Sequence, residues 1–253
     1  MSNPSSAKTV SYFIDGSDVT LPYRQHFLNL VNLVEGDPTE PFEGDLCFPH
    51  RCLNDPHGKG LRAFLARRNA SLDQARDSAE RKQHNLAWAA GLRGGRGARN
   101  ALEVGFNAGC SASIMLFSNP DLRLTCVDIG AHAYTHRCAG FLSTEFGKDR
   151  LSVIIGDSRA VLPKLVEEQQ KFDLIHIDGG HGLDAARSDL DCAAHLLSPG
   201  GTLVFDDTHE NALRALVDSF AVRQDYTCLD LPRPCTHPFA HTAYAKRTGP
   251  SHP

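Results

Sequence analysis

The sequence has no hydrophobic run that could cross a membrane, no excess of basic side chains and no CxxC pair of cysteines. No apolar stretch in its 253 residues approaches the roughly 18 that a membrane helix needs. Acidic side chains outnumber basic ones by 30 to 26, so we expect neither nucleic acid nor a membrane surface as a partner. Eight cysteines without a CxxC pair are too few for a disulfide scaffold, and no apolar signal segment opens the chain, so we expect a cytoplasmic protein.

The composition changes near residue 100 and divides the chain into two predicted regions, 1–97 and 98–253. The first region is rich in Pro, Asp, Asn and Gly and shows helical spacing of apolar residues only at 23–34 and 71–91. We therefore predict that residues 1–97 form a lid of helices and loops.

After residue 100, short apolar runs alternate with amphipathic stretches of helix length, a pattern typical of a parallel sheet covered by helices. Strands are predicted at 101–105, 122–128, 151–156, 172–178, 201–206, 226–231 and about 240–246. Only the turn-forming segment PRPCTHP separates the last two strands, so they must pair antiparallel. The prediction is an α/β fold with a doubly wound, Rossmann-like sheet of seven strands whose last strand is antiparallel.

A glycine-rich turn follows the first predicted strand and contains Glu103, Gly105, Asn107 and Gly109. Ligands of open α/β sheets bind beyond the carboxyl ends of the strands, where this turn lies. The spacing GxxxG differs from the GxGxxG of dinucleotide sites, and Glu103 would repel a pyrophosphate. The turn suits a ligand with an ammonium group and a sulfonium, although tight packing alone would also explain the glycines.

Two further aspartates stand at consecutive strand ends. Asp128 ends the second strand, where a carboxylate can accept hydrogen bonds from both hydroxyls of a ribose. Asp157, followed by Ser158, ends the third strand, where it can accept a hydrogen bond from the amine of adenine. Either aspartate could instead cap the next helix. In this order, the strand-end residues predict a nucleoside cofactor.

Residues 98–247 resemble class I S-adenosylmethionine-dependent methyltransferases. The segments FDLIHIDGGH and LLSPGGTLVFDD are similar to the metal-dependent O-methyltransferase branch, which includes catechol and macrolide-sugar O-methyltransferases. The resemblance implies S-adenosyl-L-methionine as cofactor and a sheet of strand order 3-2-1-4-5-7-6. It adds Asp178 to the predicted cofactor-binding residues and does not extend to the first hundred residues.

Three carboxylates at the ends of the fourth and fifth strands predict a metal site. Asp178 ends one strand, and Asp206 and Asp207 end its neighbour in the implied order. Adjacent strands lie about 4.8 Å apart, so these oxygens can converge on one Mg²⁺ ion. In the resembling family the matching positions bind such an ion. The alternative for Asp207 is that it caps the following helix.

Two histidines near Asp178 receive different predictions. His181 follows it by three residues, and a neutral imidazole there could take the proton from a hydroxyl group. In the macrolide-sugar branch, the histidine at the matching position resembles a general base, so the resemblance makes His181 the predicted catalytic residue. The alternative is a loop histidine that is hydrogen-bonded to the backbone. His176 lies within the fourth strand and is expected to be a hydrogen-bonded core residue.

The sequence thus predicts an S-adenosylmethionine-dependent, divalent-metal-dependent O-methyltransferase acting on a hydroxyl of a small molecule. The alternatives are a metal-independent N- or C-methyltransferase of the same fold and a non-catalytic nucleoside-binding protein. An NAD-dependent oxidoreductase is disfavoured because GxGxxG is absent. A homo-oligomer is compatible with the sequence, which does not specify the oligomeric state.

Overall fold

The computed structural model describes residues 29–30, 33, 65–66, 68–91, 93, 97–180 and 182–248. Its main elements are α4 (Leu72–Gly91), β1 (Asn100–Val104), α5 (Cys110–Ser118), β2 (Arg123–Asp128), α6 (Ala133–Phe146), β3 (Leu151–Ile155), α7 (Ser158–Glu167), β4 (Phe172–Ile177), α8 (Leu183–Leu196), β5 (Leu197–Phe205), α9 (Asn211–Arg223), β6 (Tyr226–Cys228) and β7 (Thr242–Lys246). Of the predicted helix 23–34, only residues 29, 30 and 33 are described, and they are helical. His181 lies outside the described residues.

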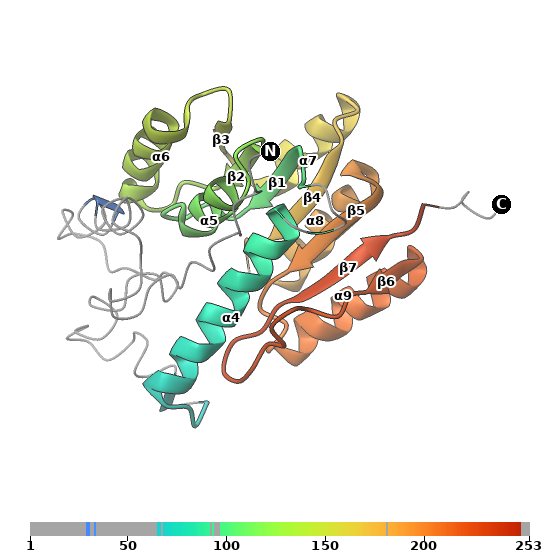
Figure 1. Ribbon diagram of the computed structural model, residues 1–253. Coiled ribbons are helices and arrows are strands. Elements are labelled where there is room, and N and C mark those ends of the chain that lie inside the picture. The colour runs from blue at the N-terminus through green and yellow to red at the C-terminus, as the bar shows by residue number, and fades with distance from the viewer. Residues whose placement is uncertain are drawn as a thin grey trace, which may run out of the picture.

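The seven strands form one sheet in the order β3-β2-β1-β4-β5-β7-β6 (Figure 1). β7 runs antiparallel to both of its neighbours, and the other pairs are parallel. This confirms the predicted doubly wound α/β architecture and its strand order. β6 is shorter than the predicted 226–231, because after Leu229 the chain leaves the sheet and turns toward α4.

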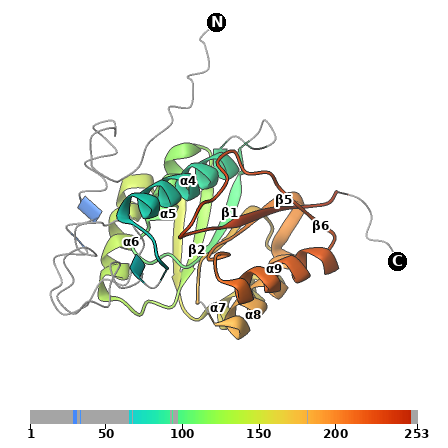
Figure 2. The same cartoon turned by 90° about the horizontal axis from the view of Figure 1, so that it is seen from below.

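Helices cover both faces of the sheet, with α4, α5 and α6 on one side and α7, α8 and α9 on the other (Figures 1 and 2). Successive strand residues point to opposite faces, so Ala101 packs in the core under α4 and α5 while Leu102 packs under α7 and α8. The sheet is thus buried on both faces, and its carboxyl edge is left to carry polar groups.

Helix α4 begins at a capping box and ends at Gly91. The amide of Ser71 donates to Gln74 Oε1 at 2.8 Å, and the amide of Gln74 donates to Ser71 Oγ at 3.2 Å. These reciprocal bonds satisfy two amides that a helix start leaves unpaired. The helix predicted at 71–91 is therefore confirmed, with its start set by this local hydrogen bonding.

The segment between β6 and β7 holds α4 against the sheet. Ser78 Oγ donates to the carbonyls of Thr236 and Phe239 at 2.9 and 2.8 Å. Asn85 donates to the carbonyl of Arg233 at 2.7 Å and accepts from its amide at 2.9 Å. Although α4 precedes residue 98, these bonds and its packing on α5 attach it to the sheet.

His241 is buried beside the contact between α4 and this segment, and its titration makes the stability of the protein depend on pH. The ring is 2% exposed, and its Nε2 lies 3.2 Å from Asn85 Nδ2. Burial lowers the pKa of His241 from 6.5 to about 3, so the folded protein holds a neutral ring. The unfolded chain takes up the proton first, so this stability is present above pH 6.5 and is lost as pH falls toward 3. At pH 5 the loss is about 2 kcal/mol.

We expect His241→Gln to lose less free energy of unfolding than the wild type between pH 7.5 and pH 5, because glutamine does not titrate. Urea denaturation at both pH values measures the difference. An equal loss in the two proteins would show that His241 does not cause the acid sensitivity.

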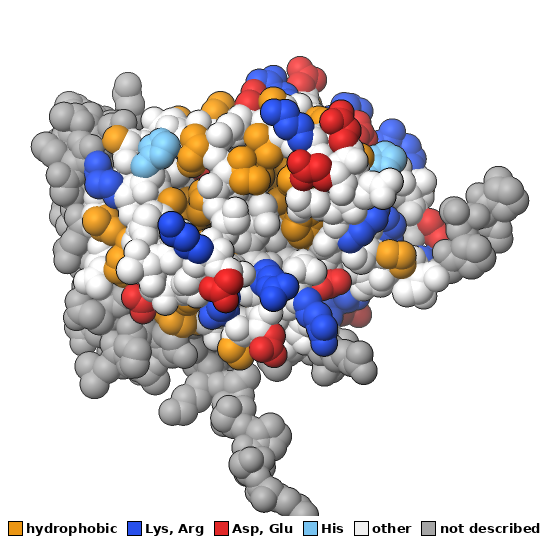
Figure 3. Space-filling model, turned by 90° about the horizontal axis from the view of Figure 1, so that it is seen from above, with side chains coloured by type: hydrophobic (Ala, Val, Ile, Leu, Met, Phe, Trp, Pro, Cys, Tyr) orange, Lys and Arg blue, Asp and Glu red, His pale blue; other side chains and the backbone are white. Residues whose placement is uncertain are grey.

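Charge on the surface is mixed. Figure 3 shows one face of the molecule, on which basic, acidic and hydrophobic side chains are interspersed. Among the described helices, none has the length and apolar character required to cross a bilayer.

Candidate active site

The turn after β1 fits against the end of β4 because residue 105 is glycine. Gly105 has a φ of +99°, and a Cβ there would lie 1.9 Å from the carbonyl oxygen of Asp178. Gly109 has a φ of +81° and begins α5, where a Cβ would lie 2.6 Å from the Phe106 ring. Both predicted glycines are thus required by backbone conformation and close approach. Asn107 between them also has a positive φ, of 51°.

Asp128 joins the two loops that border the predicted ribose position. Its Oδ2 accepts the amide of Asn107 at 2.7 Å, and its Oδ1 accepts the amide of Gly130 at 2.7 Å. Tyr134 donates to Asn107 Oδ1 at 2.8 Å and fixes that side chain too. Each carboxylate oxygen has a second lone pair, so Asp128 can hold the loops and still accept hydroxyl groups.

Asp157 caps α7 and is also paired with Arg159. Its Oδ1 accepts the amide of Arg159 at 2.9 Å, and its Oδ2 accepts the guanidinium at 2.6 Å. The hydrogen bonds from Arg159 lower the pKa of Asp157. Ser158 is the first residue of the helix. The capping role that the sequence left open is therefore present, and the second carboxylate oxygen is held by Arg159.

Two apolar side chains at this edge were missed by the sequence prediction. Ile129 directly follows β2 and is 65% exposed, and Ile155 ends β3 and is 40% exposed. Burial normally removes such side chains from water, so an exposed pair at neighbouring strand ends suits a flat apolar ligand surface. The available signal is their position beside Asp128 and near Asp157, although the sequence pattern marks both only as strand or turn residues.

Buried polar side chains form a continuous row across four neighbouring strands. We call the set Cys126 (β2), Glu103 (β1), His176 (β4) and Asp206 (after β5) the polar row. Cys126 Sγ donates to Glu103 Oε2 at 3.2 Å, and His176 Nδ1 lies 3.2 Å from Glu103 Oε1. His176 Nε2 in turn lies 3.9 Å from Asp206 Oδ2. Glu103, the predicted partner of a cationic ligand group, is fully buried and is engaged with side chains.

His176 carries a positive charge within this row. Burial alone would lower the pKa of His176, but the nearby carboxylates of Asp206 and Glu103 outweigh burial and raise it to about 10. An imidazolium between two buried carboxylates balances the charge of both. The prediction of a hydrogen-bonded core histidine is confirmed, and the structure adds that this residue connects Glu103 with Asp206.

Lys82 of α4 contacts the end of the polar row. Its Nζ lies 2.7 Å from Asp206 Oδ2, and the two side chains are only 14% and 4% exposed. Burial opposes ionisation of Asp206, but Lys82 and His176 hold its pKa well below the usual range. Nothing in the sequence indicated this pair, because Lys82 lies in another predicted region and far from Asp206 along the chain.

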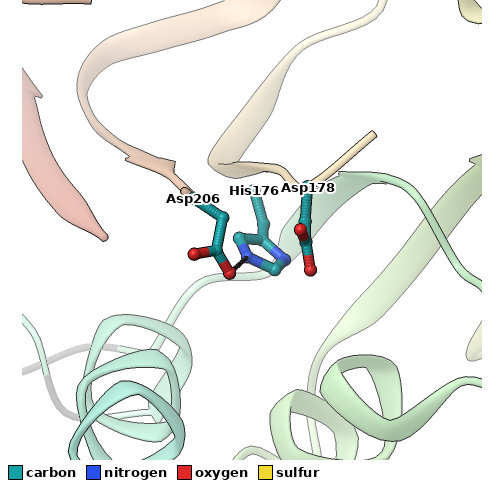
Figure 4. A group of neighbouring side chains, drawn as sticks. All are labelled: His176, Asp178 and Asp206. Carbon is teal, nitrogen blue, oxygen red and sulfur yellow. Dashed lines mark ion pairs between the residues drawn. The ribbon is translucent and has the colours of Figure 1, made fainter. Parts of the chain in front are cut away.

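The predicted metal carboxylates are only partly brought together. Ligand atoms of His176, Asp178 and Asp206 lie within 4.8 Å of one another, and Figure 4 shows the imidazole between the two carboxylates. Burial and the charge of Asp206 raise the pKa of Asp178 well above its usual value. Asp207 is not in this group: its φ is 54°, and its Oδ1 lies 3.7 Å from His209 Nδ1.

Asp207 points elsewhere because consecutive side chains at a strand end leave the backbone in different directions. Within the described part of the chain, the group therefore contains two carboxylates and the His176 ring, whose charged form has no lone pair for a metal. The two carboxylates are ligands that suit a divalent cation. The Lys82 ammonium already occupies part of the coordinating surface of Asp206.

Comparisons with known proteins agree with this geometry. Residues 102–208 match the family model described as a methyltransferase domain. No match was found among curated proteins. The solved structure of the O-methyltransferase TomG from Streptomyces achromogenes, involved in tomaymycin synthesis and in complex with SAM, is 21% identical with a TM-score of 0.54. The alignment covers 66% of this chain and 80% of that chain.

Two further structures are similar. The O-methyltransferase from Bacillus cereus in complex with SAH is 15% identical with a TM-score of 0.54, over 90% of this chain and 93% of that one. The N-methyltransferase NodS from Bradyrhizobium japonicum is 17% identical with a TM-score of 0.50, over 73% of this chain and 97% of that one. Residues 102–208 are thus similar to a methyltransferase domain, and the chain shares the fold of solved methyltransferases that hold SAM or SAH.

Proposed function

We propose that this protein transfers the methyl group of S-adenosylmethionine to a hydroxyl group of a small molecule. The observation that carries the proposal is the carboxyl edge of the matched domain, where a glycine turn, Asp128 and the carboxylates Asp178 and Asp206 meet. Two of the similar structures named above are O-methyltransferases. The chain has 30 acidic against 26 basic side chains, without the basic excess of a nucleic-acid binder, which supports a small molecule.

The described residues fit the cofactor. S-adenosylmethionine, when bound, supplies an electrophilic methyl carbon attached to a positively charged sulfur. Asp128 would accept the ribose hydroxyls, since both of its oxygens keep a free lone pair. Ile129 and Ile155 would face the adenine ring, which would cover their exposed surface. Asp157 or the start of α7 at Ser158 would receive the adenine edge.

The chain must also accept a proton. In the overall reaction, R–OH and the sulfonium give R–OCH₃, a neutral thioether and H⁺: a C–O bond forms, the C–S bond breaks, and its electron pair stays on sulfur. We propose that His181 takes the proton, because the sequence places it three residues after Asp178 between two glycines. Asp178 would orient the acceptor hydroxyl at the same edge.

We further propose a divalent ion held by Asp178 and Asp206. Such an ion, when bound, supplies positive charge that lowers the pKa of a nearby hydroxyl group. The two carboxylates and their proximity in Figure 4 support the proposal. Asp207, the third ligand predicted from the sequence, would have to turn away from His209 to reach this ion.

The test is turnover with S-adenosylmethionine and a panel of hydroxylated metabolites, with mass spectrometry to detect a methyl ether and S-adenosylhomocysteine. Paired alcohol and amine analogues in the panel separate O- from N-methylation, the activity of NodS. Product formed only from amines would replace the hydroxyl proposal. If S-adenosylhomocysteine binds and no acceptor is methylated, the non-catalytic alternative is favoured.

Metal dependence has its own expected result. Asp206→Asn should abolish any stimulation of turnover by Mg²⁺ and leave S-adenosylhomocysteine affinity nearly unchanged, because it leaves Asp128 and its bonds to the loops beside the proposed ribose position in place. Turnover with Mg²⁺ and with excess EDTA is compared in wild type and variant. Full wild-type activity in EDTA would refute the metal proposal and leave a metal-independent methyltransferase.

A further inference from the structure

Both carboxylate oxygens of Asp206 already have partners in the protein. Oδ1 accepts the amide of Asp207 at 2.6 Å, and Oδ2 lies 2.7 Å from Lys82 Nζ and 3.9 Å from His176 Nε2. A carboxylate that is 4% exposed is largely cut off from bulk solvent, so these neighbours balance its charge. The pair with Lys82 is therefore a buried ion pair within the protein.

Helix α4 is built to keep Lys82 in this place. Ser78, Lys82 and Asn85 are spaced four and three residues apart, so they share one face of the helix. Ser78 and Asn85 are bonded to the segment between β6 and β7, at Phe239 and Arg233 among others. The Phe239 ring also lies 5.8 Å from Lys82 Nζ. Anchors on either side thus fix the direction in which the ammonium points.

A divalent ion on Asp178 and Asp206 would meet this ammonium. It would bind a carboxylate whose Oδ1 already accepts an amide and whose Oδ2 lies 2.7 Å from Lys82 Nζ, so either oxygen places the ion close to the ammonium. Two cations within a few ångströms in a poorly solvated site repel each other strongly. Lys82 would have to leave Asp206 before the ion could bind there with high affinity.

We propose that Lys82 is a built-in competitor of divalent cations: it and the ion are mutually exclusive partners of Asp206. The lysine neutralises the buried carboxylate when no ion is present, so the site folds with Asp206 already in position. An ion that binds must displace the lysine from α4, which makes ion affinity depend on a helix outside the matched domain. This inference goes beyond the proposed function, since it concerns ion binding and requires no methyl transfer.

The experiment is Mn²⁺ binding, followed by electron paramagnetic resonance and by calorimetry, in the full chain without substrate. Lys82→Met keeps the length of the side chain and removes its charge, so it should bind Mn²⁺ about tenfold or more tightly than the wild type. Lys82→Arg keeps the charge and should resemble the wild type. Lys164→Met, at an exposed position of α7 on the other face of the sheet, changes the net charge equally and should have no effect.

The added Mn²⁺ affinity of Lys82→Met must arise from binding at Asp206. The double variant Lys82→Met/Asp206→Asn should lose the added affinity, and a gain that survives in it would overturn the proposal. Equal Mn²⁺ affinity in wild type and Lys82→Met, or no binding by either, would also overturn it. If Lys82→Met does not fold, Lys82→Gln keeps a hydrogen-bond donor for Asp206 and is measured in its place, with the same outcomes.

Discussion

Replacing Asp128 with alanine is expected to weaken the binding of S-adenosylhomocysteine by about 10²- to 10⁴-fold. Two charged hydrogen bonds to the ribose hydroxyls would be lost, and each contributes about 1.5–3 kcal/mol. The same carboxylate holds the amides of Asn107 and Gly130, so its removal also loosens the two loops beside the ribose. Asp128→Ala should therefore lose more affinity for S-adenosylhomocysteine than a variant that replaces a surface aspartate nearby.

Calorimetry with S-adenosylhomocysteine measures the effect. Asp121→Ala is the matched control, because Asp121 is an exposed aspartate just before the opposite end of β2. Its affinity should equal that of the wild type. Asp128→Asn, which keeps one acceptor oxygen, should bind with intermediate affinity. If Asp128→Ala binds as tightly as the wild type, Asp128 does not contact the ribose.

The second large effect is expected at His181. If its imidazole removes the hydroxyl proton, His181→Ala should lower kcat by about 10²- to 10⁴-fold with little change in cofactor affinity. A phenol is acidic enough to ionise with less help, so the loss should be greater for an aliphatic or sugar hydroxyl. Wild-type turnover should also rise with pH through the pKa of the imidazole, because only the neutral ring accepts a proton.

Turnover of wild type and variant from pH 6 to 8 on the best acceptor distinguishes this role. His195→Ala is the control, since His195 is exposed in the last turn of α8. It should leave both kcat and its pH profile unchanged. A His181→Ala protein with near-wild-type kcat across this range would exclude His181 as the base and leave the carboxylate edge to activate the acceptor.

The local features of the fold could be predicted because they depend on short stretches of sequence. Alternating apolar runs located the strands, and the brief connection at the end of the chain required the antiparallel pair. The strand order itself came from the resemblance to a family. Gly105 and Gly109 were also recognisable, since a turn between a strand and a helix needs residues that tolerate a positive φ.

The sequence by itself therefore determined the sheet and which polar residues stand at its carboxyl edge. Only the tertiary structure decided which of those residues meet: His176 joins Asp178 and Asp206, while Asp207 turns toward His209. The direction of a side chain at a strand end depends on the backbone angles of that single residue, which a sequence pattern does not specify. Lys82 reaches Asp206 because the segment between β6 and β7 holds α4 in place, and that contact joins parts of the chain that no local pattern relates.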